Sequence, residues 1–151
     1  APLRAELDRH EQQAAQRAEP NEGLADLLRW LGATPEPPRI GVITRNSKHV
    51  ADLTLAALGF RAEVVLSREC APPKPLPDAL WLACEQLEAP IEQSWMIGDY
   101  RHDIEAGRAA GVARTVFISN RTTAVEAEEH AGADLVVPTL TALVAHLDRW
   151  R

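Results

Sequence analysis

Short apolar runs alternate with amphipathic stretches along most of the chain, and this alternation predicts a parallel β-sheet flanked by helices. The runs are rich in Val, Ile and Leu, whereas the stretches between them carry apolar residues at helical spacing. Strands are expected at 40–44, 63–66, 94–97, 114–118 and 134–137, and helices at 47–58, 77–88, 103–110, 122–131 and 139–149. The predicted fold class is α/β, a Rossmann-like three-layer arrangement with helices on both faces of the sheet.

Two further helices are expected before the first strand. Residues 2–18 are polar and rich in Gln and Glu, with few apolar side chains, so this helix should be peripheral. A leucine stripe within 24–31 marks a second, packed helix that Gly32 is expected to end. The proline-rich segment 34–38 then leads into the first strand.

Composition and charge restrict the class of protein. The 151 residues, with 46% hydrophobic and 25% charged, suffice for a single packed core. The net charge of −6 without a basic stripe argues against a nucleic-acid surface, and no apolar run approaches membrane length or resembles a signal peptide. Cys70 and Cys84 have no metal-ligand companions in the sequence, so we read them as reduced thiols of a cytoplasmic protein.

Two carboxylates follow the strand expected at 94–97. A single glycine separates Asp99 from the last apolar residue of that strand. Asp99 is therefore expected at the carboxyl end of the strand, where open α/β sheets bind ligands. Asp103 is expected to begin the next helix, where an anionic side chain is favoured. Two oxygen donors without Cys or His at ligand spacing suit Mg²⁺. An aspartate in a turn followed by a helix-capping aspartate accounts for the same pattern.

A hydroxyl and a cation follow two other strands. Thr44 ends the first expected strand, and with the backbone of Arg45 and Asn46 it offers fixed donors for a phosphoryl oxygen. The alternative interpretation is that Asn46 or Ser47 simply caps the next helix. The segment can serve both as a phosphoryl-binding site and as a helix cap. Lys74 lies among prolines that restrict its backbone, and its positive charge could bind a phosphate. The alternative interpretation is that Lys74 is a solvated lysine in a loop, as most lysines are. Its substitution is expected to affect turnover far more than stability.

Taken in order, these segments resemble three motifs of the haloacid dehalogenase-like hydrolase superfamily, in its phosphoglycolate phosphatase-like group. The segment 39–47 is similar to the second motif, in which Thr or Ser binds a phosphoryl group. The segment 72–77 is similar to the third, a Lys followed by Pro, and 98–103 matches the fourth, Gly-Asp-x-x-x-Asp. The resemblance extends from about Pro20 to about Val137.

The resemblance implies a Mg²⁺-dependent phosphomonoester hydrolase that acts on a small phosphorylated metabolite. His102 and Arg101, which lie between the two carboxylates, are lesser candidates for substrate contact. The implied site comprises the substrate-binding residues Thr44, Arg45, Asn46 and Lys74, of which Thr44 and Lys74 are catalytic, and the metal ligands Asp99 and Asp103.

The first motif of the superfamily has no counterpart in this sequence. That motif, Asp-x-Asp at the end of the first strand, supplies the nucleophile that forms an aspartyl-phosphate, and no two aspartates here have that spacing. We therefore expect the first central strand to be missing from the chain, so that the strands around Val42 and Met96 do not pair directly. The alternative to a phosphomonoester hydrolase is a non-catalytic pseudo-phosphatase or binding module. Residues 1–19 are assigned to the end of a small helical cap and 20–151 to the core.

Overall fold

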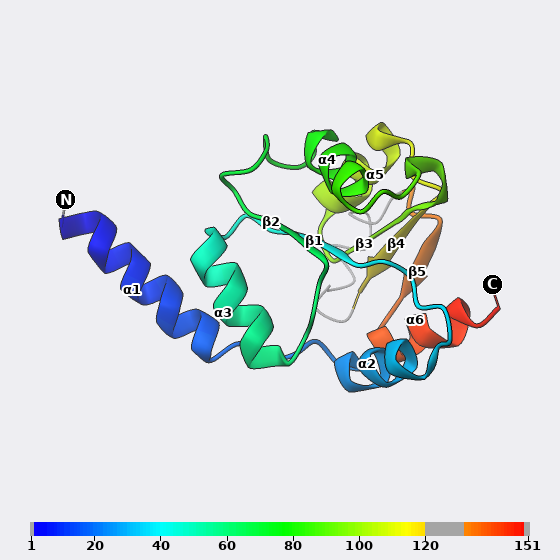
Figure 1. The fold of residues 1–151 in the computed structure, drawn as a ribbon, viewed down its shortest axis with the longest axis horizontal. Helices are drawn as coiled ribbons and strands as arrows, with labels where there is room; N and C mark the ends of the chain where they lie inside the picture. Colours follow the sequence, from blue (N-terminus) through cyan, green and yellow to red (C-terminus); the bar gives the residue numbers. More distant parts are fainter. Residues whose placement is uncertain (1, 120–131, 150–151) are drawn as a thin grey trace.

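The structure, a computed structural model, describes residues 2–119 and 132–149 and has three layers (Figure 1). The helices are α1 (Pro2–Gln16), α2 (Leu24–Ala33), α3 (Lys48–Leu58), α4 (Asp78–Gln86), η1 (Ile91–Gln93, a 3-10 helix), α5 (Arg101–Ala110) and α6 (Leu140–Leu147). The strands are β1 (Gly41–Ile43), β2 (Val64–Leu66), β3 (Trp95–Gly98), β4 (Arg114–Ile118) and β5 (Leu135–Val137). The predicted α/β class and the order of its elements are confirmed. The helix predicted at 122–131 lies outside the described residues.

The strands are all parallel, and they fall into two hydrogen-bonded sets. β1 pairs with β2, with Val42 opposite Val65, and β4 lies between β3 and β5. Within the described part of the chain no ladder joins β1 to β3. The strands around Val42 and Met96 are therefore not direct neighbours, as the prediction of a missing central strand requires.

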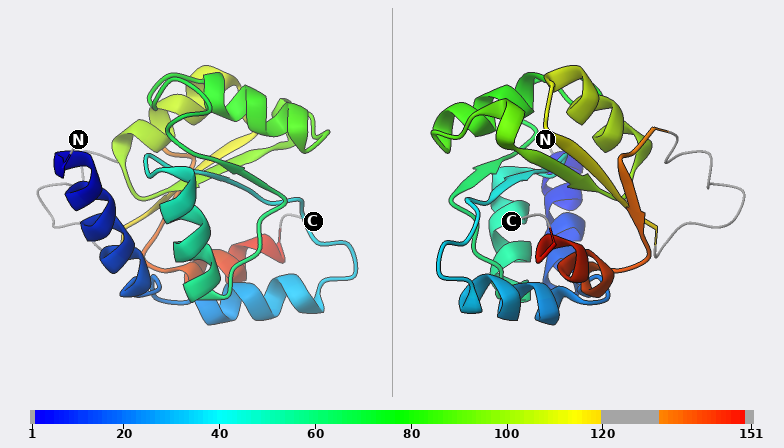
Figure 2. Two further views of the ribbon diagram at one scale, coloured as in Figure 1. Left: turned by 60° about the vertical axis from the view of Figure 1, so that its left-hand side comes forward. Right: turned by 90° about the vertical axis from the view of Figure 1, so that its right-hand side faces the viewer.

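Helix α4 holds the two sets of strands together. Its residue Ala83 packs in one cluster with Leu66 of β2, while Leu80 packs in another with Met96 of β3. Ile43 of β1 packs against both clusters. The helix layer is therefore continuous on this face, although the sheet beneath it is divided; Figure 2 shows α4 and α5 on this face and α2, α3 and α6 on the other.

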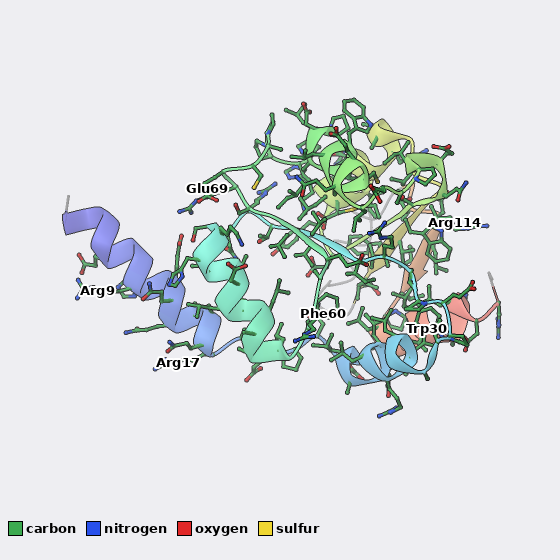
Figure 3. The ribbon with its side chains drawn as sticks, viewed as in Figure 1. Arg9, Arg17, Trp30, Phe60, Glu69 and Arg114 are labelled. Carbon is green, nitrogen blue, oxygen red and sulfur yellow. The ribbon has the colours of Figure 1, made fainter. Side chains whose placement is uncertain are left out.

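The second face of the sheet is covered mainly by α6 and α2. Val116 of β4 and Val137 of β5 pack with Leu143 of α6, and all three are nearly inaccessible to solvent. α2 lies against α6, where Trp30 (labelled in Figure 3) donates from Nε1 to a carboxylate oxygen of Asp148 at 2.7 Å. No helix in the described ranges is both long and apolar enough to cross a bilayer.

The end of α2 differs from the sequence prediction. The helix continues through Gly32 to Ala33 because Thr34 supplies the stop: its N–H and its hydroxyl both donate to the carbonyl of Trp30, at 3.0 and 2.7 Å. A bonded cap of this kind satisfies a carbonyl that the helix leaves open. Gly59, by contrast, ends α3 in the left-handed conformation (φ 66°), and the last helical residue, Leu58, agrees with the helix predicted at 47–58.

Candidate functional site

The residues after β1 form a tight turn into α3. Thr44 continues the β1–β2 pairing, since its N–H donates to the carbonyl of Leu66 at 2.9 Å. Its hydroxyl oxygen accepts from the N–H of Asn46 at 3.1 Å, which leaves the hydroxyl hydrogen to donate elsewhere. Ser47 caps α3 by accepting from the N–H of Val50 at 3.4 Å. The capping role therefore belongs to Ser47, and the Thr44 hydroxyl remains a donor at the strand end.

Lys74 is held at the end of β1 by two acceptors. Its Nζ lies 2.6 Å from Oδ1 of Asp103 and donates to the carbonyl of Ile43 at 3.3 Å. The side chain of Lys74 is 12% exposed and that of Asp103 is 7% exposed. The interpretation of Lys74 as a solvated loop residue is therefore wrong. An ammonium group has three donors, so two are used here and one remains for an anion.

Asp103 is fixed inside the first turn of α5 rather than at its start. The helix begins at Arg101, two residues before the predicted position. Oδ2 of Asp103 accepts from the N–H of Tyr100 at 3.1 Å and so satisfies an open donor of the first turn. Gly98 leaves room for this carboxylate, because a Cβ atom added there would overlap Asp103.

Close packing of α5 on β3 and β4 sets the position of that first turn. A Cβ atom added at Gly107 would come within 2.8 Å of Cβ of Met96 and 2.9 Å of Cγ2 of Thr115. Because glycine has no side chain, the helix approaches the sheet more closely here than it could with any other residue at position 107.

Asp99 directly follows β3 and is half-buried. With Asp103 it provides two hard oxygen donors at the carboxyl end of one strand. The described residues contain no group of three or more His, Cys, Asp or Glu side chains placed to hold a metal ion. Mg²⁺ is commonly bound through one or two carboxylates with water in its other positions, so this pair fits that ion by its chemistry.

Arg45, in the turn after β1, connects the loop that follows β2 with the first turn of α5. Its Nη2 donates to the carbonyl of Lys74 at 3.2 Å and lies 2.7 Å from Nδ1 of His102. Because a guanidinium has no acceptor, Nδ1 of His102 accepts this bond and the ring proton is on Nε2. The sequence indicated a role only for the backbone around Arg45. The contact between its side chain and His102 was not predicted, because the two residues are 57 positions apart.

A cleft of about 370 Å³ brings several predicted site residues together. Its volume suits a small metabolite. It is lined by Ile43, Thr44, Arg45, Ser67, Arg68, Ala71, Pro72, Pro73, Lys74 and Ala79. Asn46, Asp99 and Asp103 are not among these residues, and Asp103 acts on the cleft through its ion pair with Lys74.

Arg68 adds a further cation that sequence reasoning did not single out. Its Nη1 lies 3.3 Å from Oε1 of Glu11 on α1, and its Nε lies 3.5 Å from Oε1 of Glu69. A hydrogen bond from the Ser67 hydroxyl is the main cause that lowers the pKa of Glu69, which Figure 3 labels on the loop after β2. Arg68 therefore faces two carboxylates at the edge of the cleft.

The chain is similar to one known protein family and to proteins named as phosphatases. The sequence model of the family described as haloacid dehalogenase-like hydrolase matches residues 3–117. The chain is 33% identical over 153 residues to N-acetylmuramic acid 6-phosphate phosphatase of Pseudomonas aeruginosa, covering 98% of this chain and 66% of that protein. It is 34% identical over 84 residues to pyrophosphatase PpaX of Bacillus mycoides, covering 54% of this chain and 39% of that protein.

Solved structures show the same fold. The crystal structure of CbbY from Rhodobacter sphaeroides in complex with phosphate superimposes with a TM-score of 0.76 at 26% identity, covering 91% of this chain and 63% of that one. A hydrolase from Pseudomonas syringae gives a TM-score of 0.77 at 24% identity, covering 94% and 66%. The chain thus spans slightly less than two thirds of the length of these relatives.

Proposed function

This chain belongs to the haloacid dehalogenase-like hydrolase family, and on that basis we propose that the complete protein is a Mg²⁺-dependent phosphatase of a small phosphorylated metabolite. The observation that carries the proposal is the donor site at the end of β1, where Thr44 and Lys74 border one cleft. Relatives named N-acetylmuramic acid 6-phosphate phosphatase and pyrophosphatase PpaX support the reaction class.

In this proposal the chain supplies the groups that hold the transferring phosphoryl group. The Thr44 hydroxyl and the remaining Lys74 donor bind its oxygens, with help from the backbone of Arg45 and Asn46, and both are fixed before the reaction. Asp103 orients Lys74 through the ion pair. Asp99 and Asp103 would hold Mg²⁺, which supplies positive charge to the phosphoryl oxygens when bound.

The nucleophile is proposed to enter on a strand that lies between β1 and β3. Support comes from the divided sheet and from the lack of an Asp-x-Asp pair in these 151 residues. An aspartate oxygen would attack phosphorus while the bond to the ester oxygen breaks, and the second aspartate of the Asp-x-Asp motif would give its proton to that oxygen, so that the alcohol departs. Water would then attack the same phosphorus and give a proton back to the second aspartate, which releases phosphate and restores the nucleophilic carboxylate.

We also propose that residues 1–19 are the end of a small cap on the core formed by 20–151. α1 extends away from the rest of the molecule and packs against α3 (Figures 1 and 2). Its Glu11 reaches Arg68 at the cleft, which suits a segment that contacts substrate-binding loops. Cys70 and Cys84 carry free thiols, in keeping with a cytoplasmic enzyme.

Hydrolysis of a generic aryl phosphate by the full-length protein, with Mg²⁺ and then with EDTA, tests the proposal. Activity should require the metal, and Asp99→Asn should abolish it while the protein stays folded, because the carboxylate that holds the ion is lost. Asp52→Asn, which removes the same charge from an exposed site on α3, is the control and should leave the rate unchanged. A wild-type rate in Asp99→Asn would contradict the metal role, and an inactive wild-type protein would favour the binding module.

A further inference from the structure

Three cationic side chains line the cleft, and they differ in how their charge is balanced. Lys74 is paired with Asp103 at 2.6 Å. Arg68 lies near the carboxylates of two glutamates, at 3.3 and 3.5 Å. Arg45 has no carboxylate within 4.0 Å in the described part of the chain, and both of its hydrogen-bond acceptors are neutral. Among the described residues, Arg45 is therefore the cation of the cleft that has no carboxylate partner.

The contacts of Arg45 also fix where its free donors lie. Nη2 uses its two N–H groups on the carbonyl of Lys74 and on Nδ1 of His102. Of the five N–H groups of a guanidinium, those of Nε and Nη1 then have no hydrogen-bond partner among residues 2–119 and 132–149. An arginine that is anchored on one side and unpaired on the other is preorganised to bind an oxyanion.

We infer that Arg45 binds a second anionic group of the substrate, separate from the phosphoryl group held by Thr44 and Lys74. This inference rests on the proposed phosphatase function. The substrate class is then a compact phosphomonoester that also carries a carboxylate or a second phosphate, small enough for a cleft of about 370 Å³. His102 is a positioning residue, because it contacts the guanidinium of Arg45 and restricts its orientation.

Calorimetric titration of the full-length protein with three small phosphonates, in metal-free buffer, tests the inference. Phosphonates are used because a phosphatase cannot hydrolyse their carbon–phosphorus bond. Ethylphosphonate has one anionic group, phosphonoacetate adds a carboxylate, and methylenebisphosphonate adds a second phosphonate. The wild-type protein should bind at least one of the two latter compounds about tenfold to a hundredfold more tightly than ethylphosphonate, as expected for a charge-assisted hydrogen bond. Whichever is preferred identifies the second group as a carboxylate or a phosphate.

Arg45→Gln should remove this preference and change ethylphosphonate binding by less than about threefold, since its charge-assisted bond to the second group is lost. Arg68→Gln is the matched control, because it removes an equal charge from the same cleft, and it should retain the preference. His102→Ala should reduce the preference in part, without the loss seen in Arg45→Gln.

Other results would overturn the inference. Equal weakening of all three ligands by Arg45→Gln would place Arg45 at the transferring phosphoryl group. Loss of the preference in Arg68→Gln to the same extent would show a general charge effect, and a wild-type protein without any preference would exclude the second anionic group. Failure of ethylphosphonate to bind the wild-type protein would instead contradict the proposed phosphoryl site itself.

Discussion

Lys74 and Asp103 form an ion pair of 2.6 Å between side chains that are 12% and 7% exposed. Lys74 lies in the loop before α4 and also donates to the carbonyl of Ile43 at the end of β1, while Asp103 belongs to the first turn of α5 after β3. The pair therefore connects the ends of two strands that share no ladder. In this position it contributes to the fold as well as to the chemistry of the cleft.

The sequence predicted that a substitution of Lys74 would affect turnover far more than stability, and the burial of its ion pair overturns that expectation. Replacement of Lys74 by Ala should destabilise the protein markedly. The change leaves the Asp103 carboxylate buried without its partner, and breaking a buried pair in this way costs about 3–5 kcal/mol of unfolding free energy. The matched control is Lys48→Ala, which breaks an exposed pair of 2.9 Å with Asp52 and should cost less than about 1 kcal/mol. Urea denaturation measures both. Equal small losses would show that the Lys74 pair is exposed to water in solution.

The space around Asp103 gives a second prediction. Gly98→Ala places a methyl group on the Asp103 carboxylate, so the carboxylate must leave Lys74, and we expect a loss of about 1–3 kcal/mol together with reduced turnover. Gly32→Ala is the control, since its added methyl meets nothing within 4 Å in α2 and should stabilise the helix by up to about 1 kcal/mol. Thermal unfolding of the two variants should shift in opposite directions. A stabilising Gly98→Ala would contradict the placement of Asp103.

The helices and strands were predicted well from the sequence, because the strands are short apolar runs whereas the helices carry apolar residues at helical spacing. The strand predicted at 114–118 agrees with β4 at both ends, and the helix predicted at 47–58 ends at the same residue as α3, because the next residue, Gly59, adopts the left-handed conformation that stops a helix. The C-terminal end of α2 and the start of α5 were misplaced, whereas the end of α5 at Ala110 was correct. Each misplaced boundary depends on a hydrogen bond that spacing does not reveal: one from the Thr34 hydroxyl to the carbonyl of Trp30, the other from the N–H of Tyr100 to the Asp103 carboxylate.

The site was predicted in outline but not in its contacts. Thr44 and Lys74 were found because each follows a strand in a recognisable motif. The burial of Lys74 was missed because prolines on either side favour a loop, and the partner in α5 is distant in sequence. The bond from Arg45 to His102 was missed for the same reason. Trp81 lies on the helix predicted at 77–88, where it is 49% exposed and its Nε1 donates to the carbonyl of Ala110.

Asp134 should make stability depend on pH in the acid range. The N–H of Thr115 donates to Oδ2 of Asp134 at 2.7 Å and is the main cause that lowers the pKa of this carboxyl below 3.8. A lowered pKa stabilises the folded state at pH values above 3.8, and this contribution is lost as the pH falls through the folded pKa. Asp134→Asn should therefore cost about 1 kcal/mol near neutral pH, since the group is exposed, and progressively less in acid. Urea denaturation over a pH series measures this difference, and a cost that stays constant down to the lowest pH would contradict the assignment.

The divided sheet gives the last prediction, which concerns alternate amides of β1. The N–H of Thr44 donates to Leu66 and the carbonyl of Ile40 accepts from Glu63, so the intervening Val42 also faces β2. Backbone groups alternate along a strand, and those of Gly41 and Ile43 therefore point away from β2.

If a further strand fills the place between β1 and β3 in the full-length protein, the amides of Gly41 and Ile43 should exchange with deuterium as slowly as that of Val42. In the 151-residue chain expressed by itself, these two amides should exchange faster than those of Val42 and Thr44, because their side of β1 has no ladder. Amide exchange followed by NMR compares the two proteins directly. Equal protection of all four amides in the isolated chain would mean that something other than the proposed nucleophile strand covers this edge. Slow exchange confined to the full-length protein would locate that strand beside β1.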